Sequence, residues 1–325
     1  MPSKLDQLKQ WTVVTADSGD IGAIAQYKPQ DCTTNPSLIL KAAGMPAHQE
    51  LVEEAVLWGR SHGATTSRIT QRLAVNFGAA LTKLVPGRVS TEVDADLSFD
   101  TEGTINQARE IISDYHQRGV GRERVLIKIA ATWEGIQAAA HLQKEGIACN
   151  LTLVFCLAQA AAAAEAGIAL ISPFVGRILD WHVKTSGETY TAETDPGVLS
   201  VKQIYAYCKA YGENTIVMGA SFRNRGEIEA LAGCDSLTIA PALLDQLAAD
   251  QGTLARQLSP DAKLLAPAQM HLDEKSFRCM LNEDAMATEK LAEGIRTFSR
   301  DLQELRELVS ARLAQSAASD ALGPL

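Results

Sequence analysis

Long apolar runs are missing from this sequence, and their absence excludes one class of protein. No stretch approaches the roughly 18 consecutive apolar residues that a membrane-spanning helix needs. The N-terminal stretch is polar and carries Lys4, Asp6 and Lys9, so it lacks the apolar segment of a secretory signal. We therefore expect a protein that has no membrane partner and is located in the cytoplasm.

Closely spaced metal or redox motifs are also missing. The six cysteines and six histidines are scattered along the chain, and no pair has the spacing of a zinc, redox or helical metal site. Most of the cysteines lie in apolar runs, so we expect them to be reduced and structural. A metal-dependent mechanism is therefore disfavoured.

An excess of positive charge is absent as well. The formal net charge is −9, with 30 lysines and arginines against 39 acidic residues. Nucleic acid and anionic lipid surfaces are poor partners for such a chain. An anionic substrate would need a local cationic pocket, so arginines at unusual positions become informative.

The sequence does contain a regular alternation of short apolar runs and long amphipathic stretches. Helical patterns such as Thr101–Arg118, Trp133–Glu145, Cys156–Ala166 and Val201–Ala210 separate the short runs. This alternation is typical of a parallel sheet, and eight strands favour an α/β fold closed as a single (β/α)8 TIM barrel. The eight predicted strands, each about five to seven residues long, are Val13–Asp17, Gln30–Asn35, Arg88–Asp94, Val125–Ile129, Asn150–Phe155, Leu170–Phe174, Thr215–Ala220 and Ser236–Ala240.

Two further stretches do not fit the barrel repeat. The polar, threonine-rich stretch Gly176–Gly197 predicts an ordered loop over the barrel mouth. Apolar residues spaced by three and four in Ser276–Leu313 predict extra C-terminal helices, one or two in number. We expect one domain over residues 1–313 and a disordered tail over residues 314–325.

A lysine inside an apolar strand is the clearest chemical signal. Lys128 lies in the run Val125–Ala130, where burial of an ammonium group is costly. Desolvation lowers the pKa of a buried lysine, and a neutral amine attacks carbonyl carbon. Lys128 is therefore a candidate nucleophile. The alternative is a lysine at a strand end that extends its ammonium group to water.

Polar residues near the ends of other strands support the first interpretation. Asp17, Asn35 and Glu92 lie late in their predicted strands. The C-terminal ends of barrel strands meet at one mouth, where catalytic residues of such folds are found. The alternative for Asp17 and Asn35 is a helix-capping position.

Two more strands alternate polar and apolar residues with a period of two. Asn150 and Thr152 share one face of their strand, and Ser172 and Phe174 share one face of the next. Polar groups on an inward face are costly unless they bind each other, a lysine or a hydroxylated substrate. The alternative for Thr152 and Ser172 is a hydrogen bond to the backbone.

Two arginines are candidates for phosphate binding. Arg177 follows the sixth predicted strand, and Ser221 and Arg223 follow the seventh. Arginine binds phosphate through a planar pair of donors, and a serine hydroxyl can complete such a site. The alternative is a surface arginine paired with Asp180 or Glu227.

At these residues the sequence resembles the transaldolase family, in its long-chain group of bacterial and eukaryotic members. The similarity extends from about Leu5 to about Leu308, almost the whole chain. The matching stretches are TADSGD around Asp17, DCTTNPSLIL around Asn35, STEVDADLSFD around Glu92, VLIKIAATWEGI around Lys128, CNLTLVF around Asn150, ISPFVGRILDW around Ser172 and Arg177, and MGASFRN around Ser221 and Arg223.

The resemblance implies a Class I mechanism that needs neither a metal nor an organic cofactor. Family members move a dihydroxyacetone unit from sedoheptulose 7-phosphate to glyceraldehyde 3-phosphate in the non-oxidative pentose phosphate pathway. The products are erythrose 4-phosphate and fructose 6-phosphate. The resemblance also implies a circularly permuted aldolase barrel that forms a cytoplasmic homodimer.

The residues then take specific expected roles. Lys128 forms a Schiff base with the ketone, Glu92 and Thr152 hold a catalytic water, and Asp17 is the general acid and base. The expected substrate-binding residues are Asn35, Asn150 and Ser172 for the hydroxyls, Arg177, Ser221 and Arg223 for the phosphate, and Phe174 as a wall beside the enamine or as a residue of a barrel layer.

Two other functions remain open at this point. One is an aldolase that releases dihydroxyacetone from fructose 6-phosphate, although the small aldolases of this superfamily are much shorter and carry tyrosine where Phe174 stands. The other is a non-catalytic sugar-phosphate-binding barrel. Such a protein should have lost Lys128, Asp17 or Glu92, and all three are present.

Overall fold

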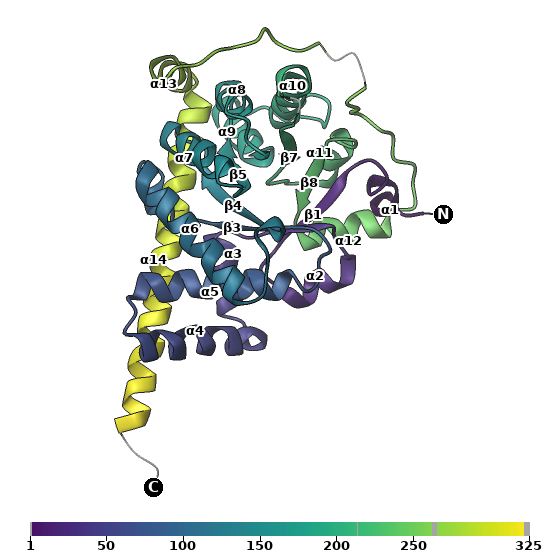
Figure 1. Ribbon diagram of the computed structural model, residues 1–325. Coiled ribbons are helices and arrows are strands. Elements are labelled where there is room, and N and C mark those ends of the chain that lie inside the picture. Colours follow the sequence, from purple (N-terminus) through teal and green to yellow (C-terminus); the bar gives the residue numbers. More distant parts are fainter. Residues whose placement is uncertain (1, 213, 262–264, 322–325) are drawn as a thin grey trace.

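The computed structural model describes residues 2–212, 214–261 and 265–321, with side chains described up to residue 315. Eight parallel strands close into a barrel in chain order, from β1 to β8. The (β/α)8 barrel predicted from the sequence is therefore confirmed (Figure 1). The strands are β1 (Val13–Asp17), β2 (Asp31–Thr33), β3 (Val89–Glu92), β4 (Val125–Ala130), β5 (Cys149–Val154), β6 (Leu170–Pro173), β7 (Ile216–Gly219) and β8 (Ser236–Ile239).

Helices surround the barrel, and several positions in the sequence fix where they begin and end. Asp100 caps one helix by accepting from the Gly103 N–H, Gly119 follows the end of that same helix, and Gly146 follows the end of another, both with positive φ, as expected for helix ends. The helices are α1 (Lys4–Leu8), α2 (Ile21–Tyr27), α3 (Pro36–Ala43), α4 (Gln49–His62), α5 (Thr66–Leu81), α6 (Thr101–Gln117), α7 (Trp133–Lys144), α8 (Leu157–Glu165), α9 (Gly176–Ser186), α10 (Pro196–Tyr211), α11 (Arg225–Ala230), α12 (Pro241–Ala249), α13 (Glu274–Glu283) and α14 (Ala285–Ala321).

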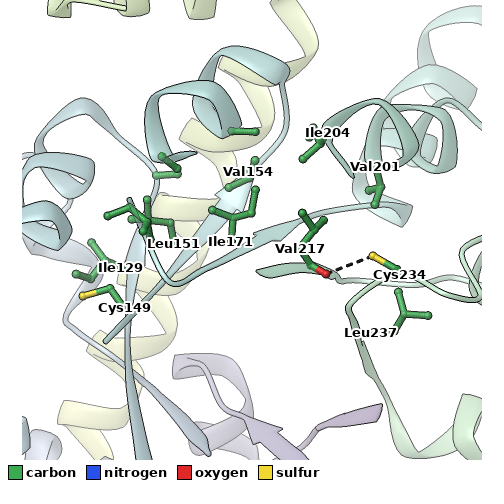
Figure 2. Packing of buried hydrophobic residues seen from close by; sticks show 14 of the residues in the cluster. Ile129, Cys149, Leu151, Val154, Ile171, Val201, Ile204, Val217, Cys234 and Leu237 are labelled. Carbon is green, nitrogen blue, oxygen red and sulfur yellow. Dashed lines mark hydrogen bonds between the residues drawn. The ribbon is translucent and has the colours of Figure 1, made fainter. Parts of the chain in front are cut away.

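Alternation of side chains along each strand separates an outer core from the barrel interior. Val217 on β7 points outward near Val201 and Ile204 of a surrounding helix, and Ile129 on β4 points outward in another part of the same buried cluster (Figure 2). Cys234 joins this layer and donates its thiol to the carbonyl of Val217 at 3.3 Å. All six cysteines are free, and five of them are buried.

The inward-facing residues of the same strands build the floor of the site. Leu126, Leu170 and Met218 form a small apolar cluster inside the barrel. Lys128 lies two residues beyond Leu126 on β4, so it points inward above this floor. The fold thereby places an amine over an apolar base.

The predicted loop over Gly176–Gly197 is wrong for its first half. Residues from Gly176 to Ser186 form α9, which ends at Gly187 in a left-handed conformation. Only residues 187–195 connect it to α10, which begins at Pro196 with Asp195 as its cap, five residues before the predicted start. The apolar residues Ile178 and Trp181 have helical spacing, but residues 183–186 are exposed, so the helical pattern is confined to the first half of α9.

Two helices follow the barrel, as predicted, and the second is longer than expected. α14 continues through residues 314–321, the first part of the segment expected to be a tail, and residues 322–325 lie outside the described residues. α14 runs along the side of the barrel and contacts α3, α4, α5, α9 and β5 (Figure 1). Arg306 anchors it to the loop after β3 through Asp94 at 2.7 Å and Asp96 at 2.8 Å.

Candidate active site

Lys128 lies at the centre of the barrel mouth, and its side chain is only 6% exposed. The strand register places Glu92 beside it on β3 and Asn150 beside it on β5. Its Nζ donates a hydrogen bond to the Thr34 carbonyl at 3.1 Å and lies 3.3 Å from Oε2 of Glu92. The structure therefore holds the amine inside the barrel and does not let it extend to water.

Glu92 and Thr152 carry buried oxygen atoms without hydrogen-bond partners among the described residues. These atoms are Oε2 of Glu92, whose contact with Lys128 is an ion pair without hydrogen-bond geometry, and Oγ1 of Thr152. Burial raises the pKa of Glu92, and the positive charges of Lys128 and Arg177 oppose that rise. Buried polar atoms without partners are costly, so these two are suited to bind a water molecule or a substrate.

Asp17 lies at the end of β1 and does not cap a helix, because Asp20 is the cap of α2. The Thr33 hydroxyl donates to Oδ1 of Asp17 at 3.0 Å. Burial raises the pKa of Asp17, whereas the charge of Lys128 and the bond from Thr33 lower it. This carboxyl can exchange a proton in an enclosed, partly neutralised setting.

Asn35 caps a helix, as one interpretation expected, and also lies at the cavity. Its Oδ1 accepts a hydrogen bond from the Leu38 N–H at 2.9 Å and so caps α3. The same residue also lines the cavity at the barrel mouth. The cap fixes the asparagine at the cavity wall and leaves its amide nitrogen available.

Asn150 and Ser172 bind each other across β5 and β6. The Ser172 hydroxyl donates to Oδ1 of Asn150 at 2.6 Å, and Nδ2 of Asn150 donates to the Ser90 hydroxyl at 3.1 Å. The alternative of a bond from Ser172 to the backbone is therefore wrong. Ser172 reaches the cavity wall, and Asn150 supports it from behind.

A cavity of about 70 Å³ brings most of the predicted residues together. Three predicted residues, Glu92, Asn150 and Arg223, do not line it directly. Among the described residues, its lining consists of Asp17, Thr33, Asn35, Lys128, Thr152, Ser172, Phe174, Arg177, Met218, Ala220, Ser221, Thr238 and Phe298.

Arg177 lies between two aromatic rings at this cavity. Its guanidinium carbon is 5.1 Å from the centre of the Phe174 ring and 5.5 Å from that of Phe298. Burial lowers the pKa of Arg177, and the nearby charge of Arg223 adds to that effect. No carboxylate among the described residues forms an ion pair with Arg177, so its donors can bind an anion.

Arg223 lies outside the cavity, as the alternative interpretation of this residue expected. Its guanidinium group is paired with Asp180 of α9, with NH2 at 2.7 Å from Oδ2. NH1 also approaches the hydroxyl of Ser221 at 3.3 Å. Ser221 lines the cavity and connects Arg223 to it.

Sequence reasoning missed five residues of the cavity wall, and three of them have polar or aromatic side chains. Thr33 and Thr238 bind each other at 2.8 Å between their hydroxyls. Both belong to strands with inward polar residues, so the alternation that identified Thr152 could have identified them. Phe298 comes from α14, and no local pattern shows that this helix reaches the mouth.

Two observations on the described residues bear on other kinds of site. No group of three histidine, cysteine, aspartate or glutamate residues in this part of the chain is arranged to hold a metal ion. None of the helices in the described ranges has the length and apolar character needed to cross a bilayer.

Comparison with known proteins places this constellation in a family. The model of the family described as Transaldolase/Fructose-6-phosphate aldolase matches residues 14–309. A transaldolase of Agrobacterium fabrum (strain C58) is 63% identical over 322 residues, which cover 98% of this chain and all of the relative. Transaldolases of Rhizobium etli (strain CIAT 652) and Marinobacter nauticus are 62% and 57% identical with the same coverage.

Proposed function

Because the chain belongs to the transaldolase/fructose-6-phosphate aldolase family and resembles transaldolases over its full length, we propose that it transfers a dihydroxyacetone unit through a Schiff base on Lys128. The donor is sedoheptulose 7-phosphate and the acceptor is glyceraldehyde 3-phosphate, and the products are erythrose 4-phosphate and fructose 6-phosphate. This reaction belongs to the non-oxidative pentose phosphate pathway. The observation that carries the proposal is the enclosed amine of Lys128 beside the buried carboxyl of Glu92.

Schiff-base formation requires protons to move around the carbinolamine. The Lys128 nitrogen attacks the C2 ketone, and the hydroxyl that forms must then leave as water. The unpartnered oxygens of Glu92 and Thr152 support a role in holding the water molecule that relays these protons. The raised pKa of Glu92 suits a group that both accepts and returns a proton.

Carbon–carbon cleavage requires a base on the opposite side of the cavity. The iminium nitrogen draws the electron pair of the breaking C3–C4 bond, and an enamine remains on Lys128. Asp17 is proposed to take the C4 hydroxyl proton and to return it to the acceptor aldehyde. Its place on the cavity wall and the charge of Lys128 that acts on it support this assignment.

The remaining residues bind the substrate in this proposal. Asn35 and Ser172 hold hydroxyls of the three-carbon unit, with Asn150 orienting Ser172. Arg177 binds the phosphate, because it is buried at the cavity without a carboxylate partner among the described residues. Ser221 and Arg223 complete the phosphate site once Arg223 breaks its ion pair with Asp180 and binds the phosphate instead. Phe174 forms a wall beside the enamine.

Transfer is favoured over release because the enamine is shielded. The cavity wall near Lys128 includes Phe174 and Phe298. These side chains exclude water, so the enamine persists without being protonated until an acceptor aldehyde binds. An aldolase would release free dihydroxyacetone from fructose 6-phosphate without an acceptor. Measuring dihydroxyacetone with and without an acceptor aldehyde separates the two reactions, and equal release in both would contradict transfer.

We also propose that the chain forms a homodimer and acts in the cytoplasm, as the family resemblance implies. Sedimentation velocity gives the oligomeric state directly. A monomer at working concentration would contradict the dimer.

Borohydride reduction tests the nucleophile. Wild-type protein treated with fructose 6-phosphate and borohydride should gain the mass of the reduced three-carbon or sugar adduct on the peptide that contains Lys128. Lys128→Ala should gain none, because it removes the lysine that lines the cavity in the described part of the chain. Lys184→Ala, which removes an exposed lysine from α9, is the matched control and should still be labelled. Undiminished labelling of Lys128→Ala would refute the assignment.

A further inference from the structure

Two buried carboxyl groups lie beside the proposed phosphate site without lining the cavity. Asp195 is 2% exposed and Glu227 is fully buried. Asp195 caps α10 and accepts from the N–H groups of Gly197 at 2.7 Å and Val198 at 3.2 Å. Glu227 belongs to α11, and its carboxyl lies close enough to Asp195 for each group to act on the pKa of the other.

A second negative charge on such a pair is energetically unfavourable. Two adjacent carboxylates in a buried place repel each other, so one of them retains a proton. Burial raises the pKa of Asp195, and the backbone N–H groups at the start of α10 oppose that rise because they stabilise its charged form. Burial, together with the charge of Asp195, raises the pKa of Glu227 to about 7. Glu227 therefore loses its proton only near neutral pH.

Glu227 also holds the backbone of the turn after β7. Its Oε2 accepts from the Arg223 N–H at 2.7 Å, and its Oε1 accepts from the side-chain amide of Asn224 at 3.3 Å. Ser221 in the same turn has a φ of 63°, which is unfavourable for a residue with a side chain. Such a conformation persists only where surrounding contacts fix it.

Contacts on the other side of the turn connect it to α9. The Ser221 carbonyl accepts from the Gly176 N–H at 2.8 Å. At Gly176 an added Cβ would lie 2.5 Å from that carbonyl oxygen, so the two segments are in close contact. The turn is thus held by α9 on one side and by Glu227 on the other.

We propose that Glu227, with Asp195 beside it, positions the Ser221–Arg223 turn for phosphate binding through its hydrogen bond from the Arg223 N–H. Glu227 is then a positioning residue, because it acts through the Arg223 backbone and does not touch the substrate. The inference rests on the proposed phosphate role of Ser221 and Arg223.

The simpler role of Glu227 is to cap α11. Asn224 is the cap residue of this helix, and its Oδ1 accepts from the Glu227 N–H at 3.1 Å. A residue that only caps would change the stability of the fold and leave substrate preference and pH dependence unchanged. Those two readouts therefore separate the roles.

Other charged groups near Asp195 and Glu227 could also affect the pH profile, and the same readouts distinguish their effects from that of Glu227. Arg223 faces Glu227, and His182 of α9 acts on Asp195. Arg225 of α11 is paired instead with Asp250 at 2.8 Å. A pH effect that disappears in Glu227→Gln belongs to Glu227 and not to His182.

The test compares fructose 6-phosphate with fructose as donors, with unphosphorylated D-glyceraldehyde as acceptor for both. The measured quantity is the ratio of the two kcat/KM values, which isolates recognition of the donor phosphate. Glu227→Ala should lower this ratio by about tenfold, because the turn loses the hydrogen bond that fixes Arg223.

The wild-type ratio should also fall as the pH rises through about 7, where Glu227 loses its proton and its negative charge repels that of Asp195. Glu227→Gln keeps both an acceptor for the Arg223 N–H and a donor for Asp195 but cannot ionise. Its ratio should therefore lose this pH dependence. The Gln variant also keeps the test decisive if Glu227→Ala does not fold.

Asp235→Asn is the matched control. Asp235 accepts a hydrogen bond from the Val217 N–H at 2.9 Å at the opposite end of the barrel, so its loss should change stability and leave the ratio unchanged. Equal ratios in Glu227→Ala and wild type, or the same pH profile in Glu227→Gln and wild type, would overturn the inference. If Arg223→Ala itself leaves the ratio unchanged, the phosphate role of Arg223 fails first, and the inference falls with it.

Discussion

Replacing Gly294 with alanine should disturb the contact between α14 and the barrel mouth. An added Cβ at this position would lie 2.7 Å from Cδ2 of Leu153 and 3.2 Å from NH1 of Arg177. Leu153 is fully buried and has a φ of 57°, next to a shift in the register between β5 and β6. The leucine has little freedom to move away, so the helix or the arginine must shift.

Two opposing effects decide the size of the change. Alanine stabilises the interior of a helix by about 0.5–1 kcal/mol relative to glycine. Overpacking a well-packed core costs about 1–3 kcal/mol. The clash therefore outweighs the helix propensity, and we expect Gly294→Ala to lower the free energy of unfolding by about 1 kcal/mol or more. The melting temperature should then fall by a few degrees.

The substitution should also affect substrate binding, because Arg177 lies in the same contact. We expect a higher KM for fructose 6-phosphate with a smaller change for fructose. Thermal unfolding and steady-state kinetics measure both effects. Gly22→Ala in α2 is the matched control, since its added Cβ would meet only Oδ1 of Asp20 at 3.5 Å.

The control should keep or raise the melting temperature and leave KM unchanged. If Gly294→Ala behaves in the same way as Gly22→Ala, α14 is not packed against Leu153 and Arg177 as described. The reasoning that makes α14 a part of the active site would then be refuted.

Three further substitutions test the site. Asp17→Asn should still give a borohydride-trapped adduct but lower kcat by about 10²–10⁴-fold, and turnover near the wild-type level would require another acid–base group. Thr152→Ala should slow Schiff-base formation in rapid-mixing experiments without changing the preference for phosphorylated donors, and unaltered formation would remove Thr152 from the proton relay. Arg177→Ala should weaken the binding of fructose 6-phosphate, relative to that of fructose, more than Arg223→Ala does, because Arg223 must first break its ion pair with Asp180. The reverse order in the KM values would contradict the position of Arg177 at the cavity.

Most of the catalytic arrangement could be predicted because the barrel fixes where strand ends lie. Once eight strands close in chain order, the ends of β1, β3, β4 and β5 meet at one mouth. An inward-facing polar residue late in an apolar strand then lies at this mouth. Lys128, Glu92 and Asp17 were found in this way, and the structure brings them together.

The parts that could not be predicted depend on contacts between distant segments. The second half of α9 is exposed, so the polar stretch that contains it resembles a loop. The sequence offered Asp180 as a partner of Arg223 but could not decide between that pairing and phosphate binding. The position of Phe298 follows from how α14 docks on the barrel. No local pattern in Ser276–Leu313 contains that information.

The contribution of α14 to the cavity wall affects when the enzyme becomes competent during synthesis. All eight strands are translated by Ile239, whereas Gly294 and Phe298 follow much later. Chains fold from the N-terminus as they leave the ribosome. A nascent chain whose eight strands have left the ribosome would thus contain Lys128 but lack Phe298 in the cavity wall, and the wall would be complete only after α14 has been synthesised.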